Sequence, residues 1–162
     1  MLNSLAKVIA AETSEADFRD IISKLPKPLV FTNGCFDILH RGHTTYLEQA
    51  RNLGGSLIVA ANTDASVKRQ NKGDDRPINS LEDRMALLSS LECVNAVISF
   101  DEDTPFNVIK RIMPDHLVKG GDWDIQDIVG GDIVLANGGQ VHSIDFEFNR
   151  STTSLINQIR NV

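Results

Sequence analysis

Short apolar segments alternate along this sequence with longer segments of helical periodicity, and this alternation constrains the fold more than any other feature. Residues 57–61 are apolar at every position, as in a strand that is buried on both faces of a sheet. Parallel strands need a crossover connection, and such crossovers are right-handed. We therefore predict an α/β fold, a Rossmann-like open parallel five-stranded sheet flanked by helices. The predicted strands cover residues 29–31, 57–61, 96–100, 117–118 and 141–144.

Cap residues predict where the helices between these strands begin. Ser14 is followed by Asp17, and Ser80 by Asp83, at the spacing of a capping box. Further helices are expected from Thr44, Thr104 and Ser151, and a short helix followed by a loop within residues 62–77. No repeat or linker divides the chain. We expect a single domain over residues 1–162, with an N-terminal helical extension at 1–26 and the core of the domain at 27–162.

Composition narrows the choice of partners. The net charge of −6 argues against nucleic acid or an anionic membrane as the partner. No apolar stretch approaches the roughly 20 residues of a membrane span, and we expect no signal peptide. Two cysteines, Cys35 and Cys93, are too few for a disulfide framework, so we expect a cytoplasmic protein. Cys35 is interpreted as a packing residue.

The most informative segment runs through residues 29–53. An apolar strand leads into a turn with Gly34, then into His40-Arg41-Gly42-His43, and then into a helix. Two histidines three apart at the start of a helix can point the same way, and Gly42 lets a ligand approach the backbone. The helix N-terminus adds amide donors and a positive dipole end, which together form an anion site. By residue type alone, the pair could instead bind a metal or cap the helix.

The sequence HRGH, followed in order by NTDASV, KGDDRP, LEDRMALLSSLECV, DEDTP, PDHLVKGGDW and STTS, resembles the cytidylyltransferase-like nucleotidyltransferases with their HxGH signature. The resemblance extends over nearly the whole chain after Lys27. Within that family the chain is most similar to heptose 1-phosphate adenylyltransferases, in a form without the fused sugar-kinase domain.

This resemblance implies transfer of AMP from ATP to D-glycero-β-D-manno-heptose 1-phosphate, with ADP-heptose and pyrophosphate as products, for lipopolysaccharide core or capsule heptose. The nucleophile would be a phosphate oxygen, which is largely ionised at neutral pH because its second pKa is about 6. Positioning and charge neutralisation would therefore carry the catalysis. The implied cofactor is Mg²⁺, held mainly through the triphosphate and not by protein side chains alone.

The resemblance also assigns roles to individual residues. Catalytic roles fall on His40, His43 and Lys72. Asp37 and Arg84 are candidates for substrate binding. The expected nucleotide-binding residues are Thr32, Asn33, Gly34, Phe36, Arg76, Lys119, Gly120, Asp122, Trp123, Ser151, Thr152 and Thr153.

Several of these residues also have a plain structural interpretation. Phe36 suits the core as well as a ligand site, and Asp37 suits orienting the motif by hydrogen bonds better than binding a metal. Arg84 could form a structural ion pair. Lys72 and Arg76 could belong to a solvated charged loop, and Ser151 to a simple helix cap. His116 and His142 match no catalytic element, so we expect both to be structural.

Two other functions stay open at this point. The sequence GGDW is similar to the GDDW of glycerol-3-phosphate cytidylyltransferases, so another sugar- or alditol-phosphate cytidylyltransferase is the first alternative. The second is a catalytically idle nucleotide-binding regulatory module, although the joint presence of HRGH, Lys72, Lys119 and STTS argues against it. The resemblance further implies a homo-oligomer, at least a dimer, and a separate kinase that supplies heptose 1-phosphate.

Overall fold

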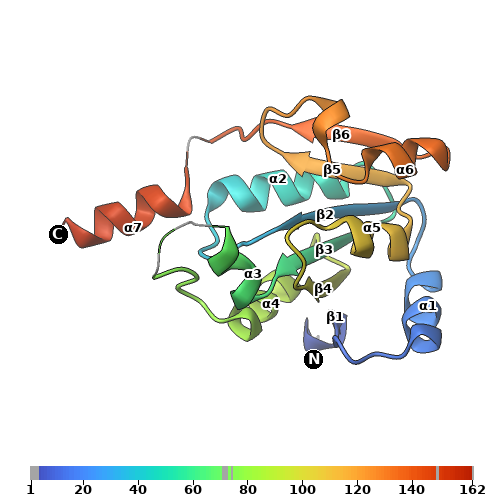
Figure 1. The fold of residues 1–162 in the computed structure, drawn as a ribbon, viewed down its shortest axis with the longest axis horizontal. Helices are drawn as coiled ribbons and strands as arrows, with labels where there is room; N and C mark the ends of the chain where they lie inside the picture. The colour runs from blue at the N-terminus through green and yellow to red at the C-terminus, as the bar shows by residue number, and fades with distance from the viewer. Residues whose placement is uncertain (1–3, 71–72, 74, 149, 162) are drawn as a thin grey trace.

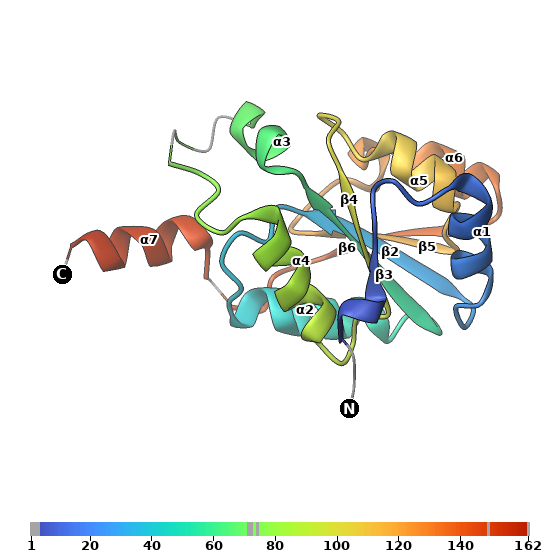
Figure 2. The same ribbon diagram turned by 90° about the horizontal axis from the view of Figure 1, so that it is seen from below.

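The computed structural model describes residues 4–70, 73, 75–148 and 150–161. Its strands form a single parallel sheet in the order β1-β4-β3-β2-β5-β6, with helices on both faces (Figures 1 and 2). The predicted open parallel α/β fold is confirmed. The strands are β1 (Val8–Ile9), β2 (Leu29–Gly34), β3 (Ser56–Asn62), β4 (Ala96–Phe100), β5 (His116–Gly120) and β6 (Gln140–Ile144).

The helices begin close to the predicted caps. Ser14 Oγ accepts a hydrogen bond from the Asp17 amide, and Ser80 Oγ accepts one from the Asp83 amide, both at 3.2 Å. The helices are η1 (Ser4–Lys7), α1 (Glu15–Ser23), α2 (Arg41–Arg51), α3 (Asp64–Arg69), α4 (Leu81–Ser90), α5 (Phe106–Ile112), η2 (Ile125–Asp127), α6 (Gly131–Ala136) and α7 (Thr152–Arg160).

The predicted number of five strands was one short, because β1 also joins the sheet. Val8 pairs with Val97 and Ile9 with Ile98 of β4. A strand of two residues has no measurable periodicity, so the sequence around it gave no strand signal. The segment before residue 27 is therefore not only helical. Its division from a catalytic core at 27–162 stays a prediction.

Alternate residues of β2 belong to two apolar layers. Leu29 and Phe31 pack in one cluster with side chains of α1, α5 and α6, whereas Val30 packs in a second cluster with side chains of α2 and α4. Figure 2 shows the same division, with α2 and α4 on one face of the sheet and α1, α5 and α6 on the other. Because successive side chains of a strand point to opposite faces, the same alternation assigns each later residue of β2 to one face of the sheet.

A crevice is expected where the chain order of the strands reverses, between β2 and β5. The β2–β3 pairing continues to Gly34 opposite Ala61, and the β5–β6 pairing continues to Gly120 opposite Ile144. The β2–β5 pairing, by contrast, ends at Phe31 opposite Leu117. The two central strands separate beyond this pair, at their carboxyl ends, which is where open α/β sheets bind ligands.

Candidate active site

The two histidines of the HRGH segment lie at the start of α2 with their rings stacked. His40 is the N-cap of α2, and its ring centroid lies 3.8 Å from that of His43 with the planes 20° apart. A Cβ at Gly42 would lie 3.1 Å from the His40 ring. Glycine at this position therefore leaves room for the stacked pair at the positive end of the helix dipole.

His40 is suited to act as a neutral hydrogen-bonding group. Burial lowers the pKa of His40, because the charged imidazolium loses its hydration. The ring is therefore neutral at pH 7, with one nitrogen that donates and one that accepts. Within the described part of the chain, His40 Nδ1 is buried and has no hydrogen-bond partner. A buried polar atom of this kind at a cavity wall indicates a ligand-binding position.

The turn before α2 is strained at Phe36. Its φ of 48° lies in the left-handed region, which a bulky residue rarely adopts. The Phe36 ring is buried, and its centroid lies 5.3 Å from that of His43 in an edge-to-face arrangement. A Cβ at Gly34 would lie 3.0 Å from the Phe36 ring, so glycine makes room for the ring. Phe36 serves the core and supports a histidine, and such strain is typical of functional sites.

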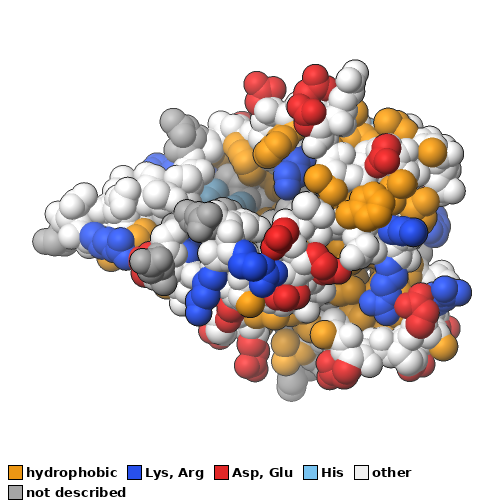
Figure 3. All heavy atoms as spheres, in the orientation of Figure 1, with side chains coloured by type: hydrophobic (Ala, Val, Ile, Leu, Met, Phe, Trp, Pro, Cys, Tyr) orange, Lys and Arg blue, Asp and Glu red, His pale blue; other side chains and the backbone are white. Residues whose placement is uncertain are grey.

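These side chains open into a cavity of about 800 Å³, here called the histidine cavity. Figure 3 shows histidine side chains at the bottom of a hollow beside α7. The cavity brings together segments that are more than 100 residues apart in the sequence. Its lining consists of Cys35, Phe36, Asp37, His40, His43, Arg76, Phe146, Arg150, Ser151, Thr152 and Thr153.

The N-terminus of α7 is a second helix end at this cavity. Ser151 is its N-cap, with Oγ accepting a hydrogen bond from the Ser154 amide at 3.1 Å. Thr152 Oγ1 donates to the carbonyl of Ile38 at 3.3 Å, which ties α7 to the turn after β2. Two helix N-termini and two arginines around one cavity favour a ligand with several negative charges.

Asp37 is buried and holds Arg76 in place. Asp37 Oδ2 accepts from Arg76 Nε at 2.5 Å, and Oδ1 accepts from the amides of Ile78 at 2.8 Å and Asn79 at 2.9 Å. Burial alone would raise the pKa of Asp37, but the two amides and the guanidinium outweigh it and hold the pKa below its usual value. Both carboxylate oxygens are thus engaged within the protein, which agrees with an orienting role for Asp37.

Other expected site residues lie behind the cavity. Arg84 is fully buried, and its guanidinium donates to the Cys35 carbonyl at 2.6 Å, the Asn79 carbonyl at 3.1 Å and Asp64 Oδ1 at 2.7 Å. Arg84 lines neither of the two cavities described in this section, and its expected role in substrate binding stays a prediction. Thr32 is likewise buried, and its hydroxyl bonds that of Tyr46. Lys72 lies outside the described residues.

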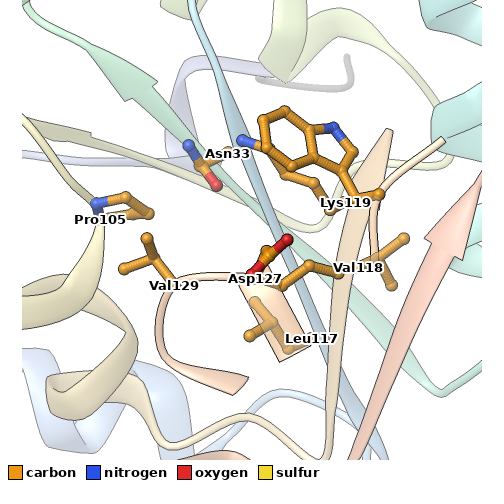
Figure 4. A pocket seen from close by; sticks show the side chains of 9 residues that line it. Asn33, Pro105, Leu117, Val118, Lys119, Asp127 and Val129 are labelled. Atoms are coloured by element: carbon orange, nitrogen blue, oxygen red, sulfur yellow. The ribbon is translucent and has the colours of Figure 1, made fainter. Parts of the chain in front are cut away.

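The segment after β5 lines a second, smaller cavity of about 400 Å³, here called the Asp127 cavity. Figure 4 shows Asn33, Lys119 and Asp127 converging on it. Trp123 Nε1 donates to the Gly120 carbonyl at 3.1 Å, and Lys119 Nζ lies 5.6 Å from the indole centroid. The lining residues are Asn33, Pro105, Leu117, Val118, Lys119, Trp123, Asp127, Ile128 and Val129.

The glycines between the two cavities allow close packing. A Cβ at Gly120 would lie 2.7 Å from the Phe146 ring and 3.2 Å from Tyr46, and Gly121 has a φ of 108°. Asp122 is exposed and lines neither cavity. The expected nucleotide-binding residues thus divide into two groups, and the structure places Asn33, Lys119 and Trp123 apart from the histidines.

Among the lining residues that were not expected at the site, three carry a charged or aromatic side chain. Arg150 directly precedes the STT sequence, so its charge was a usable signal. Phe146 lines the histidine cavity and is 43% exposed, and its ring meets that of Tyr46 edge to face with the centroids 5.5 Å apart. Asp127 belongs to none of the motifs, and only the fold places it in the lining of a cavity.

The described part of the chain contains no group of three or more histidine, cysteine, aspartate or glutamate side chains that could hold a metal ion. No helix in that part has the length and apolar character needed to cross a membrane.

A doubly wound sheet whose switch point carries imidazoles, arginines and two helix N-termini defines a class of phosphate-binding α/β enzymes. The model of the cytidylyltransferase-like family matches residues 31–153. The chain belongs to this family and is a nucleotidyltransferase.

Individual relatives are more similar still. The chain is 56% identical to D-beta-D-heptose 1-phosphate adenylyltransferase of Bordetella bronchiseptica over 137 residues. This region covers 85% of each of the two chains. It is 57% identical over 133 residues to the bifunctional protein HldE of Ectopseudomonas mendocina, but spans only 28% of that protein's length.

Solved structures agree on the fold. A lipopolysaccharide core biosynthesis protein from Thermoplasma volcanium superposes with a TM-score of 0.61 at 29% identity, over 75% of this chain and 98% of the other. Pantoate-beta-alanine ligase from Francisella tularensis superposes with a TM-score of 0.57 over 96% of this chain and 78% of the other. The latter pair shares 14% identity, so this similarity concerns the fold alone.

Proposed function

We propose that this protein is an adenylyltransferase that transfers AMP from ATP to D-glycero-β-D-manno-heptose 1-phosphate, releasing pyrophosphate. The observation that carries the proposal is the 56% identity to an enzyme of that name across 85% of both chains. The histidine cavity supports it, because its helix ends, imidazoles and arginines suit a triphosphate.

In the proposed reaction an oxygen of the acceptor phosphate attacks the α-phosphorus of ATP. A new P–O bond forms, the bond to the oxygen that bridges the α- and β-phosphorus breaks, and that oxygen leaves with the pyrophosphate. No base is needed, because the nucleophilic oxygen is already ionised. The protein must hold two anions in line and neutralise the charge that grows on the leaving group.

The residues of the histidine cavity supply these functions. The N-termini of α2 and α7 are proposed to bind the β- and γ-phosphates, with Arg76 and Arg150 offsetting their charge. His40 and His43 would donate hydrogen bonds that strengthen as the leaving oxygen gains charge. Lys72, which lies outside the described residues, is proposed to act with them, as the family resemblance implies.

Mg²⁺ is the proposed cofactor. Mg²⁺ is commonly bound by substrate phosphates with few protein ligands, and it would offset the negative charge of the triphosphate. Asp37 is the carboxylate in the wall of the histidine cavity, and its oxygens are engaged by Arg76 and two amides. Because these Asp37 oxygens already accept hydrogen bonds, they support the proposal that the metal ion is held mainly through the phosphates.

The wider context is also proposed from the relatives. HldE is described as bifunctional, and this chain corresponds to 28% of the length of the matched HldE protein. We infer that a kinase activity outside these 162 residues supplies the heptose 1-phosphate. A cytoplasmic location suits ATP as substrate, and a homo-oligomer is expected from the family resemblance.

The test crosses ATP, CTP, GTP and UTP with heptose 1-phosphate, heptose 7-phosphate and glycerol 3-phosphate in the presence of Mg²⁺. Pyrophosphate release and product mass are measured for each pair. We expect ATP with heptose 1-phosphate to give the highest kcat/KM and ADP-heptose as the product. A preference for CTP and glycerol 3-phosphate would support the cytidylyltransferase alternative. An inactive protein that still binds ATP would support an idle module.

A further inference from the structure

The two cavities lie toward opposite faces of the sheet. Phe31 of β2 packs with α1, α5 and α6, whereas Thr32 bonds Tyr46 of α2 on the other face. Because side chains alternate along a strand, Asn33 lies on the same side of the sheet as Phe31. In β5, Leu117 belongs to the Phe31 cluster, so Lys119 follows it to the same side. The Asp127 cavity is thus on the α5 and α6 side, and the histidine cavity is at the ends of α2 and α7.

This arrangement matches the requirement of an in-line displacement. The entering oxygen and the leaving oxygen lie on opposite sides of the phosphorus that is attacked. If pyrophosphate leaves toward α2 and α7, the acceptor must approach from the opposite side. β2 and β5 separate beyond Phe31 and Leu117, and the Asp127 cavity lies at that point.

The lining of the Asp127 cavity has the chemistry of a sugar site. Asn33 can donate and accept, Asp127 accepts, and Lys119 donates, which together suit several hydroxyl groups and one phosphate. No hydrogen bond or salt bridge joins the side chains of Asn33 and Asp127 to other described residues. Leu117, Pro105 and the other apolar residues form the rest of the wall, as in many small-molecule sites.

Backbone hydrogen bonds fix the position of Asp127. Its amide donates to the Asp124 carbonyl at 3.0 Å in η2, and Asp124 Oδ1 caps this turn by accepting from the Gln126 amide at 3.0 Å. The carboxylate is thus presented to the cavity by an ordered turn. A fixed acceptor of this kind can select among sugars by the position of a hydroxyl group.

We propose that the Asp127 cavity binds the sugar part of the acceptor, with Asp127 and Asn33 contacting its hydroxyl groups and Lys119 directing its phosphate toward ATP. This inference rests on the proposed function. It also changes the expected role of Trp123, from stacking on the nucleotide base to forming a wall for the apolar face of the sugar ring. The base then lies beside the exposed ring of Phe146 in the histidine cavity, which is twice as large.

The test compares Asp127→Asn with a matched control, Asp132→Asn. Both variants remove one negative charge from an exposed residue, but Asp132 lies in the first turn of α6 and does not line the cavity. The KM for heptose 1-phosphate, kcat and, separately, the Kd for ATP with Mg²⁺ are measured. We expect Asp127→Asn to raise the acceptor KM by about 10- to 100-fold, the range for a hydrogen bond to a charged group, with the Kd for ATP unchanged. Asp132→Asn should match the wild type.

A second readout follows the single tryptophan of the chain. With a non-hydrolysable ATP analogue bound, added heptose 1-phosphate should change the fluorescence of Trp123, and the change should require higher concentrations in Asp127→Asn. A weakened Kd for ATP with an unchanged acceptor KM would assign the cavity to the base and overturn the proposal. Unchanged values for both substrates would overturn it as well.

These outcomes are separate from a failure of the proposed function. If the wild-type protein does not use heptose 1-phosphate, the proposed function fails first. The variants are then compared with the acceptor identified in the substrate screen. A selective rise in the KM for that acceptor would still support an acceptor site, while an effect on ATP alone would reject it.

Discussion

At the scale of single residues, the site contains two kinds of side chain. Some face the cavity where the ligand is proposed to bind, and others hold neighbouring residues in position. His40 and His43 face the histidine cavity, whereas Asp37 has its carboxylate oxygens engaged by Arg76 and two amides. Substitutions of the two kinds should therefore fail differently. The first should reduce turnover in a folded protein, and the second should reduce stability.

His43→Ala tests the catalytic kind. An imidazole at the N-terminus of α2 donates best to an oxygen that gains charge in the transition state, so its loss lowers kcat more than ATP affinity. We expect turnover to fall by about 10²–10³-fold, the usual effect of losing one such donor. His40→Ala should behave similarly. Steady-state pyrophosphate release and an ATP titration check this.

His142→Ala is the control for the histidine variants. His142 Nε2 lies 3.0 Å from His116 Nδ1, within the β5–β6 pair, and lines neither cavity. Its turnover should stay close to that of the wild type. A His43→Ala protein with normal turnover would contradict the catalytic assignment of the HRGH segment.

Asp37→Asn tests the positioning kind. Removing the charge leaves the buried Arg76 without its partner, and breaking a buried ion pair costs about 3–5 kcal/mol. The pKa of Asp37 is lower in the folded state than in the unfolded state, so its contribution to stability is complete above the unfolded pKa of about 3.9 and is lost as the pH falls through the folded value.

Urea unfolding of Asp37→Asn and wild type as a function of pH measures this contribution. The difference in the free energy of unfolding should be largest at neutral pH and should shrink below about pH 4. A difference that does not vary with pH would mean that the carboxylate charge of Asp37 does not stabilise the fold.

At the scale of elements, Arg84 of α4 joins three segments that surround the site. It contacts Asp64 in α3, the Cys35 carbonyl after β2 and the Asn79 carbonyl before α4. Arg84→Met keeps the length of the side chain but leaves these acceptors without their donor. We expect a loss of about 3–5 kcal/mol in stability and a higher KM for ATP, because the turn that carries Phe36 loses its support.

Arg69→Met provides the comparison for Arg84→Met. Arg69 pairs with Asp101 and Asp103 on the surface, with its side chain 44% exposed, and exposed pairs contribute about 0–1 kcal/mol. Chemical unfolding and ATP titration of both variants measure the difference. If Arg84→Met were as stable as Arg69→Met, the buried arginine would not link these elements.

The helices and strands could be predicted because their signals are local. Ser14, Ser80 and Ser151 cap helices in the structure as predicted, and the apolar residues 57–61 are buried in β3. The contacts of Arg84 and the place of Trp123 could not be predicted, because their neighbours come from distant parts of the chain. The motifs named residues of the site, but only the fold separates them into two cavities.

At the scale of the whole molecule, the sheet consists of two parts that meet between β2 and β5. Two residue pairs, Val30 with His116 and Phe31 with Leu117, connect these strands. The histidine cavity draws its lining from both sides of this junction, since α2 follows β2 and α7 follows β6. A ligand bound there contacts both parts and should hold them together.

We therefore expect ATP with Mg²⁺ to slow hydrogen exchange on both sides of the junction. A ligand that binds only the native state stabilises it by about 2.7 kcal/mol at 100 times its Kd, and local opening that breaks the site is suppressed by the same amount. The amides of residues 41–44 in α2, of β5 and of residues 150–156 should become more protected. The amides of α1, which line neither cavity, serve as the internal control. Protection confined to α2 would mean that ATP does not bridge the two parts, and the proposed role of the α7 N-terminus in binding the phosphates would then be wrong.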